Sequence, residues 1–349
     1  MSTNTIPESS ASRAASSASQ VAVSIIIEWA NTELNGTPRA KILLELLGRQ
    51  WGQLLRHEYP EGLSPEAIQY LDRLVTPAQV LIISATPIED GVEKEIRSGV
   101  PADFDLELHV TPGLEYYGLK NFGAERATGN LILFVDSDVE PEAGWLAHLL
   151  GTFADPSMQV VCGQTYIPPD SLYASAFSLG WTYDLRDPRG RLIQPVKVYA
   201  NNIVFHAEVF RQTGFASLGK RSRGASSLLR KHLEQLGISI WENRSARVGH
   251  PPPANFQHLT TRALAHGRDH YMKHTERRTL YCLGRSFWIA GKRMCRGFAR
   301  TFRHASDVGV KFWQVPAVLT IISCYYAFFA AGGLLTHISP EAMGRRFRV

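Results

Sequence analysis

The sequence predicts an α/β protein with a mostly parallel, doubly wound sheet. Short apolar runs of strand length alternate with segments of helical periodicity over residues 21–135. The run at residues 131–135 is hydrophobic throughout, as in strands that are buried on both faces. It ends at Asp136 and Asp138, at the strand end where open α/β sheets bind their ligands. These observations predict a polar site at one edge of the sheet.

Local sequence features in the first half of the chain predict each of these elements. Residues 21–27 (VAVSIII) are predicted to form the first strand because β-branched residues dominate them. Helical periodicity predicts a helix over residues 38–57, and Ser64 followed by Pro65 predicts the start of a second one over residues 64–74. Further strands are predicted over 80–83, 106–110 and 131–135, with a helix over 121–127 that Gly129 ends.

The pattern changes after Pro141. Helices are predicted over residues 144–153, 207–213 and 226–236, and strands over 159–163, 196–205 and 238–241. The whole chain has 349 residues, of which 44% are hydrophobic, enough for one large domain or two closely packed ones. No internal repeat is visible.

Composition also bounds the surroundings of the protein. Residues 1–20 are rich in Ser and Ala, so a disordered tail is predicted there, without the apolar core of a secretory signal. The 4 cysteines have neither metal-ligand nor disulfide spacing, which indicates a reducing compartment. Basic residues crowd the last third of a chain of net charge +5, beside a long apolar segment. This favours a membrane surface as partner, and we expect no nucleic acid because no nucleic-acid-binding motif accompanies the charge.

Asp136 and Asp138 have two interpretations at this point. Two buried carboxylates are costly unless something neutralises them, and a divalent cation bridging to a phosphate would do so. Alternatively, Asp-Ser-Asp forms an acidic turn that caps the following helix. The motif by itself leaves both open.

With their neighbours, these residues resemble a family-two glycosyltransferase of the GT-A fold, of a membrane-anchored bacterial type. The resemblance covers roughly residues 21–255. It rests on an ordered set of segments: a first strand that ends in a polar turn, Asn121-x-Gly123, Ala127-x-Gly129, Asp136-Ser137-Asp138, NNIVFHAEVF at residues 201–210 followed by Gly214-Phe215, and Val248-Gly249-His250.

The resemblance implies a nucleoside-diphosphate sugar as donor and Mg²⁺ or Mn²⁺ as cofactor. Asp138 would coordinate the metal directly, Asp136 would lie near the ribose and the metal, and His250 would be a further ligand or merely cap a strand. Trp29 would stack on the base or belong to the core. The remaining implied residues are Glu28, Asn31, Ser84 and Asn121 for the nucleotide, and Asn201, Asn202 and Ser226 on the acceptor side.

Two departures from the family pattern concern acids. Ser84 stands where an acidic residue usually holds the nucleoside. Ala225 and Ser226 replace the Glu-Asp pair whose Asp is the general base for inverting attack, and a serine hydroxyl is too weakly basic for that task. Another group such as Asp184 supplies the base, or the acceptor is already ionised, or catalysis is lost.

The C-terminal third predicts a membrane attachment. Residues 312–336 are apolar and uncharged, long enough as a helix to cross a hydrocarbon core of about 30 Å, with a buried core helix as the alternative. Within residues 256–311 a basic amphipathic helix is predicted to lie on anionic lipid, followed after the apolar segment by a basic tail, residues 337–349. Its basic side would carry Arg285, Lys292, Arg293, Arg296, Arg300 and Arg303, and its apolar side Phe287, Ala290, Met294 and Phe298.

The predicted protein is therefore a metal-dependent, inverting, non-processive glycosyltransferase. A single-pass or hairpin anchor would hold it at the inner membrane, its catalytic domain on the cytoplasmic side where the basic load is greater. Lipid-linked or cell-envelope glycans would be the acceptors. One alternative is a catalytically inactive GT-A domain that serves as a membrane-tethered binding or assembly subunit, as the missing acids suggest. Another is a nucleotidyltransferase, but no Gly-rich basic loop follows the first strand.

Overall fold

The computed structural model describes residues 20–195, 197–218, 224–273 and 279–346. The predicted N-terminal tail, residues 1–20, lies outside the described residues except for Gln20, and so do the last residues of the predicted basic tail.

The N-terminal half forms the predicted parallel sheet. Its strands lie side by side in the order β3-β2-β1-β4, with Glu28 at the end of β1 beside Asp136 at the end of β4. The strands are β1 (Val23–Glu28), β2 (Ala78–Ser84), β3 (Phe104–Val110) and β4 (Leu131–Asp136). The helices of this half are α1 (Ala30–Asn35), α2 (Thr37–Leu55), α3 (Pro65–Leu71), α4 (Asp90–Gly99) and α5 (Tyr116–Arg126).

The second half extends the same sheet with mixed direction. Strand β8 runs antiparallel between β4 and β6, and β9 follows parallel to β6. The α/β prediction is confirmed, but the parallel arrangement is continuous only from β3 to β4. The remaining strands are β5 (Glu140–Pro141), β6 (Val160–Tyr166), β7 (Leu192–Ile193), β8 (Asn202–His206) and β9 (Ile240–Gly249); the helices are α6 (Trp145–Gly151), α7 (Leu172–Gly180), α8 (Ala207–Thr213) and α9 (Ala225–Gln235), with a 3₁₀ turn at Thr152–Ala154.

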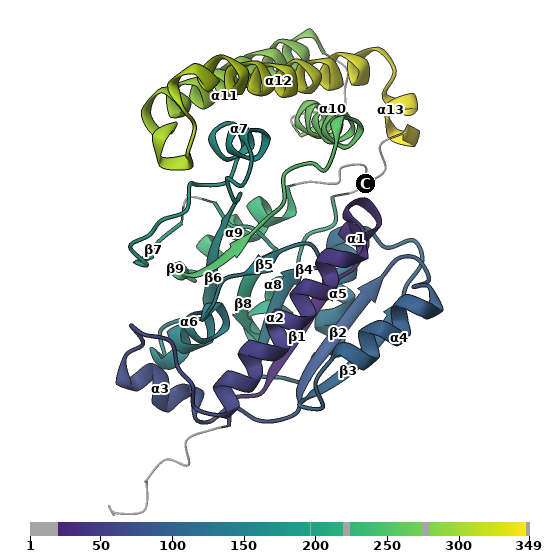
Figure 1. The fold of residues 1–349 in the computed structure, drawn as a ribbon. Helices are drawn as coiled ribbons and strands as arrows, with labels where there is room; N and C mark the ends of the chain where they lie inside the picture. The colour runs from purple at the N-terminus through teal and green to yellow at the C-terminus, as the bar shows by residue number, and fades with distance from the viewer. Residues whose placement is uncertain (1–19, 196, 219–223, 274–278, 347–349) are drawn as a thin grey trace, which may run out of the picture.

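Alternate residues of the central strands face two separate cores. Ile25 and Ile27 of β1 pack with α2 and α6, whereas Ile26 packs with α5 and the phenylalanines of β8 and α8. All three isoleucines are fully buried. Helices therefore cover both faces of the sheet (Figure 1), and the polar ends of the strands are left at its edge.

A helical layer lies above the ends of the strands (Figure 1). It contains α10 (Phe256–Met272), α11 (Leu280–His304), α12 (Val315–Ile338) and α13 (Pro340–Arg346), with 3₁₀ turns at Ser306–Val308 and Phe312–Gln314. Helices α10 and α12 approach so closely that a Cβ on Gly267 would lie 1.9 Å from the carbonyl oxygen of Phe329. A Cβ on Gly332 would likewise lie 2.2 Å from the carbonyl oxygen of Leu264.

Helix α12 is the apolar segment predicted to span a membrane. In the described part of the chain, Phe312–Ile338 is one stretch that is long and apolar enough to do so, and 39% of its most apolar window is buried inside the protein. Its inner side is fixed by hydrogen bonds, from Trp181 Nε1 to Tyr325 Oη at 3.0 Å and from Tyr326 Oη to the carbonyl oxygen of Gly180 at 2.7 Å. The helix thus packs along the folded domain.

Periodicity predicted which apolar residues of α11 face the lipid, and this prediction is wrong in detail. Ala290, Met294 and Phe298 belong to the core that α11 shares with α7 and α12, because these helices cover them. Arg300 also turns inward, donating to the carbonyl oxygens of Ser178, Trp181 and Tyr183 at the end of α7. The exposed apolar side chains of α11 are Leu280, Tyr281, Phe287, Trp288 and Phe302.

Candidate active site

Asp136 lies in a buried polar cluster at the ends of β1 and β4. Lys120 Nζ donates to Asp136 Oδ1 at 2.8 Å, and Tyr116 Oη donates to the same oxygen at 2.7 Å. Asn31 Nδ2 donates to Asp136 Oδ2 at 3.2 Å. The side chains of the ion pair are 0% exposed for Lys120 and 6% for Asp136. The carboxylate is thus held and neutralised by the protein itself.

The sequence analysis missed Lys120 and Tyr116, although a signal for them exists. Helix α5 begins at Tyr116, five residues before the predicted start, and residues 116, 120 and 123 share one face of it. At Gly123 a Cβ would lie 2.7 Å from Cγ2 of Ile26, so this face presses against the sheet. A lysine one turn before such a glycine must be buried and needs an acid, which Asp136 provides.

Glu28 is buried beside this cluster. It accepts hydrogen bonds from Asn31 Nδ2 at 2.7 Å and from the Ala30 N–H at 3.1 Å. Burial, and then the Asp136 carboxylate, raise the pKa of Glu28 well above its ordinary value, and Lys120 opposes this. A Glu28 carboxyl that keeps its proton can donate a hydrogen bond, which an ionised one cannot.

Asp138 and His250 meet at the same edge of the sheet, from β4 and the end of β9. His250 Nε2 lies 3.9 Å from Asp138 Oδ2, and both side chains are buried. His250 Nδ1 lies 2.7 Å from the carbonyl oxygen of Pro251, the geometry of a donated Nδ1–H. Burial lowers the pKa of His250, while Asp138 partly opposes the shift. A neutral imidazole therefore presents its Nε2 lone pair toward the side of Asp138.

This pair fits a divalent cation in part. Ligand distances of about 2.1 Å allow one ion to join two atoms up to about 4.2 Å apart. Across the described residues, no group of three or more His, Cys, Asp or Glu side chains is arranged to hold a metal. The structure does not assemble the predicted set of Asp136, Asp138 and His250 as one metal group, because Lys120 holds Asp136. Mg²⁺-type sites commonly use one or two protein ligands and complete their shell with phosphate oxygens and water.

The other predicted nucleotide residues have structural contacts. Trp29 is 4% exposed and belongs to the core beside α2, as its alternative interpretation had it. Ser84 Oγ donates to the Thr86 carbonyl oxygen and accepts from the Thr86 N–H. Asn121 bonds both the N–H and the carbonyl oxygen of Phe215, at 2.9 and 2.8 Å. Of the predicted nucleotide set, Glu28, Asn31 and Asp136 come together.

On the acceptor side, Asn201 and Asn202 point to different neighbours. Asn202 Oδ1 accepts from Trp145 Nε1 at 2.8 Å inside the sheet. Asn201 Oδ1 accepts from Thr165 Oγ1 at 3.1 Å, and its Nδ2 lies 3.4 Å from Tyr183 Oη. Ser226, in the first turn of α9, lies 3.1 Å from Tyr117 Oη, and Ala225 is fully buried. No carboxylate therefore begins α9.

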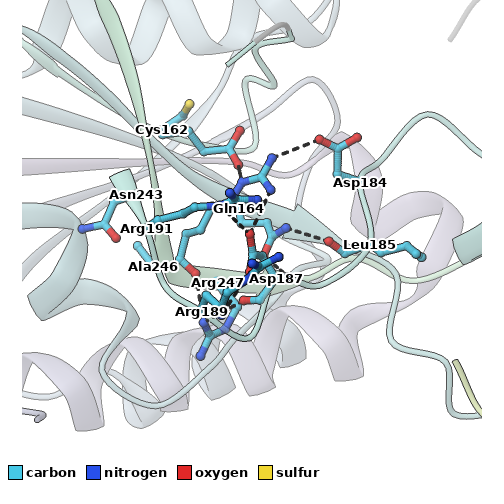
Figure 2. Close-up of polar contacts among 12 residues, drawn as sticks. Cys162, Gln164, Asp184, Leu185, Asp187, Arg189, Arg191, Asn243, Ala246 and Arg247 are labelled. Atoms are coloured by element: carbon cyan, nitrogen blue, oxygen red, sulfur yellow. Dashed lines mark hydrogen bonds and ion pairs between the residues drawn. The ribbon is translucent and has the colours of Figure 1, made fainter. Parts of the chain in front are cut away.

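Asp184, the predicted substitute base, lies in an ionic network that also contains Asp187 and Arg191 (Figure 2). Arg244 is the centre of this network. Arg244 bonds Glu242 at 2.7 Å and both Asp184 and Asp187 at 3.2 Å. The Arg189 N–H, and then Arg244 and Arg191, lower the pKa of Asp187 to about 2, while burial raises the pKa of Glu242. Sequence reasoning missed Glu242 and Arg244, which alternate along β9.

Comparisons with known proteins fall on the same segment. The profile of glycosyl transferase family 2 matches residues 80–220, from β2 through the Asp136-Ser137-Asp138 motif and β8. This segment of the chain is therefore similar to glycosyltransferase family 2. A pre-mycofactocin glycosyltransferase of Mycobacterium tuberculosis is 36% identical over 94 residues, 26% of this chain and 20% of that protein.

One further relative and one solved structure cover more of this chain. A glucosyl-dolichyl phosphate glucuronosyltransferase of Haloferax volcanii is 25% identical over 217 residues, 54% of this chain and 64% of that one. The chain thus spans between 20% and 64% of these curated relatives. A mannosyltransferase from Pyrobaculum calidifontis, solved with GDP-Man and Mn²⁺, superposes with a TM-score of 0.51 at 14% identity, covering 93% of this chain and 89% of that one. The predicted GT-A fold is confirmed.

Proposed function

We propose that this protein transfers a sugar from a nucleoside-diphosphate donor to an acceptor at a membrane surface. The observation that carries the proposal is the buried pair of Asp138 and His250 beside the Asp136 cluster, at the edge of the sheet and within or next to the segment that matches the family. The match of residues 80–220 to a glycosyltransferase family and the similarity to glycosyltransferases support it.

Each residue of the donor side has a role in this proposal. Asp138 and His250 would hold Mg²⁺ or Mn²⁺, which supplies positive charge against the departing diphosphate. Asp136, which is held by Lys120 and Tyr116, would accept a hydrogen bond from a ribose hydroxyl. Glu28 and Asn31 would face the nucleoside. The Pyrobaculum mannosyltransferase, with its GDP-Man and Mn²⁺, supports this class of donor and metal by analogy.

Inversion in a single addition follows from the family pattern, but the usual base is replaced. Ala225 is buried and Ser226 faces Tyr117, so the start of α9 offers no proton acceptor. Asp184 is bonded to Arg244. An acceptor oxygen that is already ionised, as in a phosphate monoester, removes the need for a base.

Binding and turnover of the donor test this function. Thermal unfolding of the full chain with UDP- or GDP-sugars should show a stabilisation that requires Mn²⁺ or Mg²⁺. Asp138→Asn should abolish the metal-dependent part and lower transfer about 100-fold or more, because an amide replaces a charged ligand. Asp155→Asn, at an exposed position away from the site, is the matched control. Donor binding that is unchanged by removal of the metal and by Asp138→Asn would refute the proposal.

A second candidate is a binding or assembly subunit with this fold but without catalysis. The absence of a carboxylate in the first turn of α9 favours it, within the residues that the structure describes there. It predicts metal-dependent donor binding with neither donor hydrolysis nor transfer, even when membranes from a bacterial cell are added as a source of acceptors.

We also propose that the helical layer attaches the protein to the cytoplasmic face of the inner membrane. Its apolar outer face consists of exposed side chains of α11 and of the 3₁₀ turn Phe312–Gln314: Leu280, Tyr281, Phe287, Trp288, Phe302, Phe312 and Trp313. The five on α11 fall within about 120° of the helix circumference at 3.6 residues per turn. The exposed Lys292, Arg296 and Arg303 border them. Such a surface suits the boundary between lipid headgroups and acyl chains.

The contacts of α12 favour a helix that lies along the membrane surface over one that crosses it. A spanning α12 would lose the bonds of Tyr325 and Tyr326 to Trp181 and Gly180. Cysteines placed at Lys311 and Ser339, the two ends of the helix, distinguish the arrangements. In inverted membrane vesicles both should react with an impermeant maleimide if α12 lies flat. Reaction at one end alone would support a single span.

Substitution of the apolar outer face tests the attachment itself. Trp288→Glu should weaken binding to vesicles that contain anionic lipid by roughly tenfold, because a large apolar side chain no longer leaves water. Leu236→Glu provides the control, since Leu236 is also exposed, at 49%, but lies at the end of α9. Equal vesicle binding by the two variants would contradict the assignment.

A further inference from the structure

A polar cavity lies between the second half of the sheet and helix α11. Its volume is about 220 Å³, and it is bounded by β6, β9, the segment between α7 and β8, and α11. The side chains that carry charge in its wall are Asp184, Lys197, Glu242, Arg244 and Arg296. The proposed donor site does not include it, and it meets the border of the apolar outer face only at Arg296.

The charges in the wall of the cavity are unevenly satisfied. Arg244 is fully engaged, since it bonds Glu242, Asp184 and Asp187. Within the described residues, Lys197 and Arg296 form no ion pair, and Lys197 Nζ donates to the carbonyl oxygen of Thr182 at 2.6 Å. Two cations thus remain at the cavity without an anion of the protein bonded to them.

The surroundings of Lys197 add further positive charge near its ammonium group. Burial lowers the pKa of Lys197, and the charges of Arg296, Arg300 and Arg293 lower it further, whereas Asp184 opposes them. Three arginines of α11 therefore lie close enough to repel this half-buried ammonium group. An anion between Lys197 and Arg296 would relieve the repulsion and gain charge-assisted hydrogen bonds.

The cavity is one layer of side chains from the donor site. Thr165, in its wall, donates to Asn201, and Asn201 lies 3.4 Å from Tyr183 Oη. The Tyr183 ring packs at 5.2 Å from the ring of His250. On its other side the cavity reaches Arg296 of α11, which borders the apolar outer face. An acceptor entering from the membrane surface would thus pass Arg296 before it reached the donor.

We propose that this cavity binds the phosphate group of a phosphomonoester acceptor between Lys197 and Arg296. The inference rests on the proposed function and names its acceptor class. An ionised phosphate oxygen forms the bond to the anomeric carbon of the donor sugar. The bond from that carbon to the β-phosphate oxygen breaks, and the nucleoside diphosphate leaves with the electron pair. No proton has to be removed from the acceptor, which accounts for a chain with Ala225 and Ser226 at the position of the usual base.

Calorimetric binding to the full chain tests the cavity, with citronellyl phosphate, citronellol and inorganic phosphate as probes. Arg296→Gln and Lys197→Gln should each weaken citronellyl phosphate binding about tenfold or more, since each removes a charged hydrogen-bond donor. Arg49→Gln, at an exposed position of α2, should leave it unchanged. Gln preserves the helix at 296, and thermal unfolding of each variant verifies that it folds.

The probes separate the sources of the phosphate. Binding of citronellyl phosphate but not of inorganic phosphate supports a lipid acceptor, and comparable binding of both supports a soluble phosphate ester. The proposal would be overturned if citronellol bound as tightly as citronellyl phosphate. It would also be overturned if the Arg296→Gln and Lys197→Gln variants bound citronellyl phosphate as tightly as the parent. Metal-dependent donor binding is measured separately on the same variants. Its persistence would show that the cavity assignment alone had failed, and its absence in the parent would refute the proposed function.

Discussion

Two ionic clusters on the two halves of the sheet contrast in how they satisfy charge. On the proposed donor side, one lysine and one aspartate form a nearly fully buried pair, with side chains 0% and 6% exposed. On the acceptor side, one arginine serves three acids, and Asp184 among them is 52% exposed. The first cluster is rigid and balanced, so its geometry is fixed before a ligand arrives. The second borders a cavity, where solvent can share the compensation of charge.

The largest effect should come from breaking the buried pair. Lys120→Met leaves the Asp136 carboxylate buried without its cation, which should lower the free energy of unfolding by about 3–5 kcal/mol. The double variant Lys120→Met with Asp136→Asn should recover part of this loss, because the uncompensated charge is gone. Urea denaturation measures both.

The surface pair of Lys41 and Glu95 supplies the control for that experiment. Its side chains are 41% and 57% exposed, so Lys41→Met should cost at most about 1 kcal/mol. If Lys120→Met were as mild as Lys41→Met, the donor cluster would not be the rigid element that the contrast requires.

An intermediate effect is expected in the acceptor-side network. Arg244→Gln removes the partner shared by Glu242, Asp184 and Asp187, and should cost about 1–3 kcal/mol. Arg191 also bonds Asp187, at 2.9 Å, but its side chain is 52% exposed, so Arg191→Gln should cost less than about 1 kcal/mol. Denaturation at neutral pH compares the two, and equal losses would contradict the central role of Arg244.

The smallest effect concerns pH and the raised pKa of Glu28. The folded protein holds this proton to higher pH than the unfolded chain, whose ordinary value is 4.5. The stabilisation from Glu28 is therefore complete below that value, and it declines as pH rises through the pKa of the folded state. Glu28→Gln removes the titration at the expense of the hydrogen bond from the Ala30 N–H.

The measurement is the free energy of unfolding between about pH 5 and about pH 8. Glu28→Gln should make its decline with pH shallower, whereas Glu61→Gln, at an exposed position, should leave the slope of the parent. An unchanged slope in Glu28→Gln would show that Glu28 is ionised in the folded protein and that the donor cluster is less dry than its burial indicates.

The elements of the fold were predictable where the sequence had a strong local period. The strand ending at Asp136 was found within one residue, and the helix over residues 207–213 was found with its bounds. Helices α1, α4 and α7 were missed. On α11 the period predicted a helix, but which apolar side faced water depended on the helices packed against it.

The candidate site also has a part that was predictable from the sequence and a part that was not. The position of Asp136 and Asp138 at a strand end was readable, as was the proximity of Glu28 on the neighbouring strand. The cation at Asp136 was not, because helix α5 had to begin at Tyr116 for Lys120 to face the sheet. Asn31 and Asp136, which are hydrogen-bonded, lie 105 residues apart in the chain.

The sequence by itself indicated the parallel part of the sheet, its polar edge and the family resemblance, because periodicity, turn residues and short motifs are local properties of a chain. Only the tertiary structure decided which charges meet. It paired Asp136 with Lys120, brought His250 to Asp138, left Lys197 and Arg296 at a cavity, and laid α12 along the domain. These outcomes depend on how elements that are distant in sequence pack together. Packing determines which charged side chains are buried, and burial sets the free-energy cost of keeping them charged.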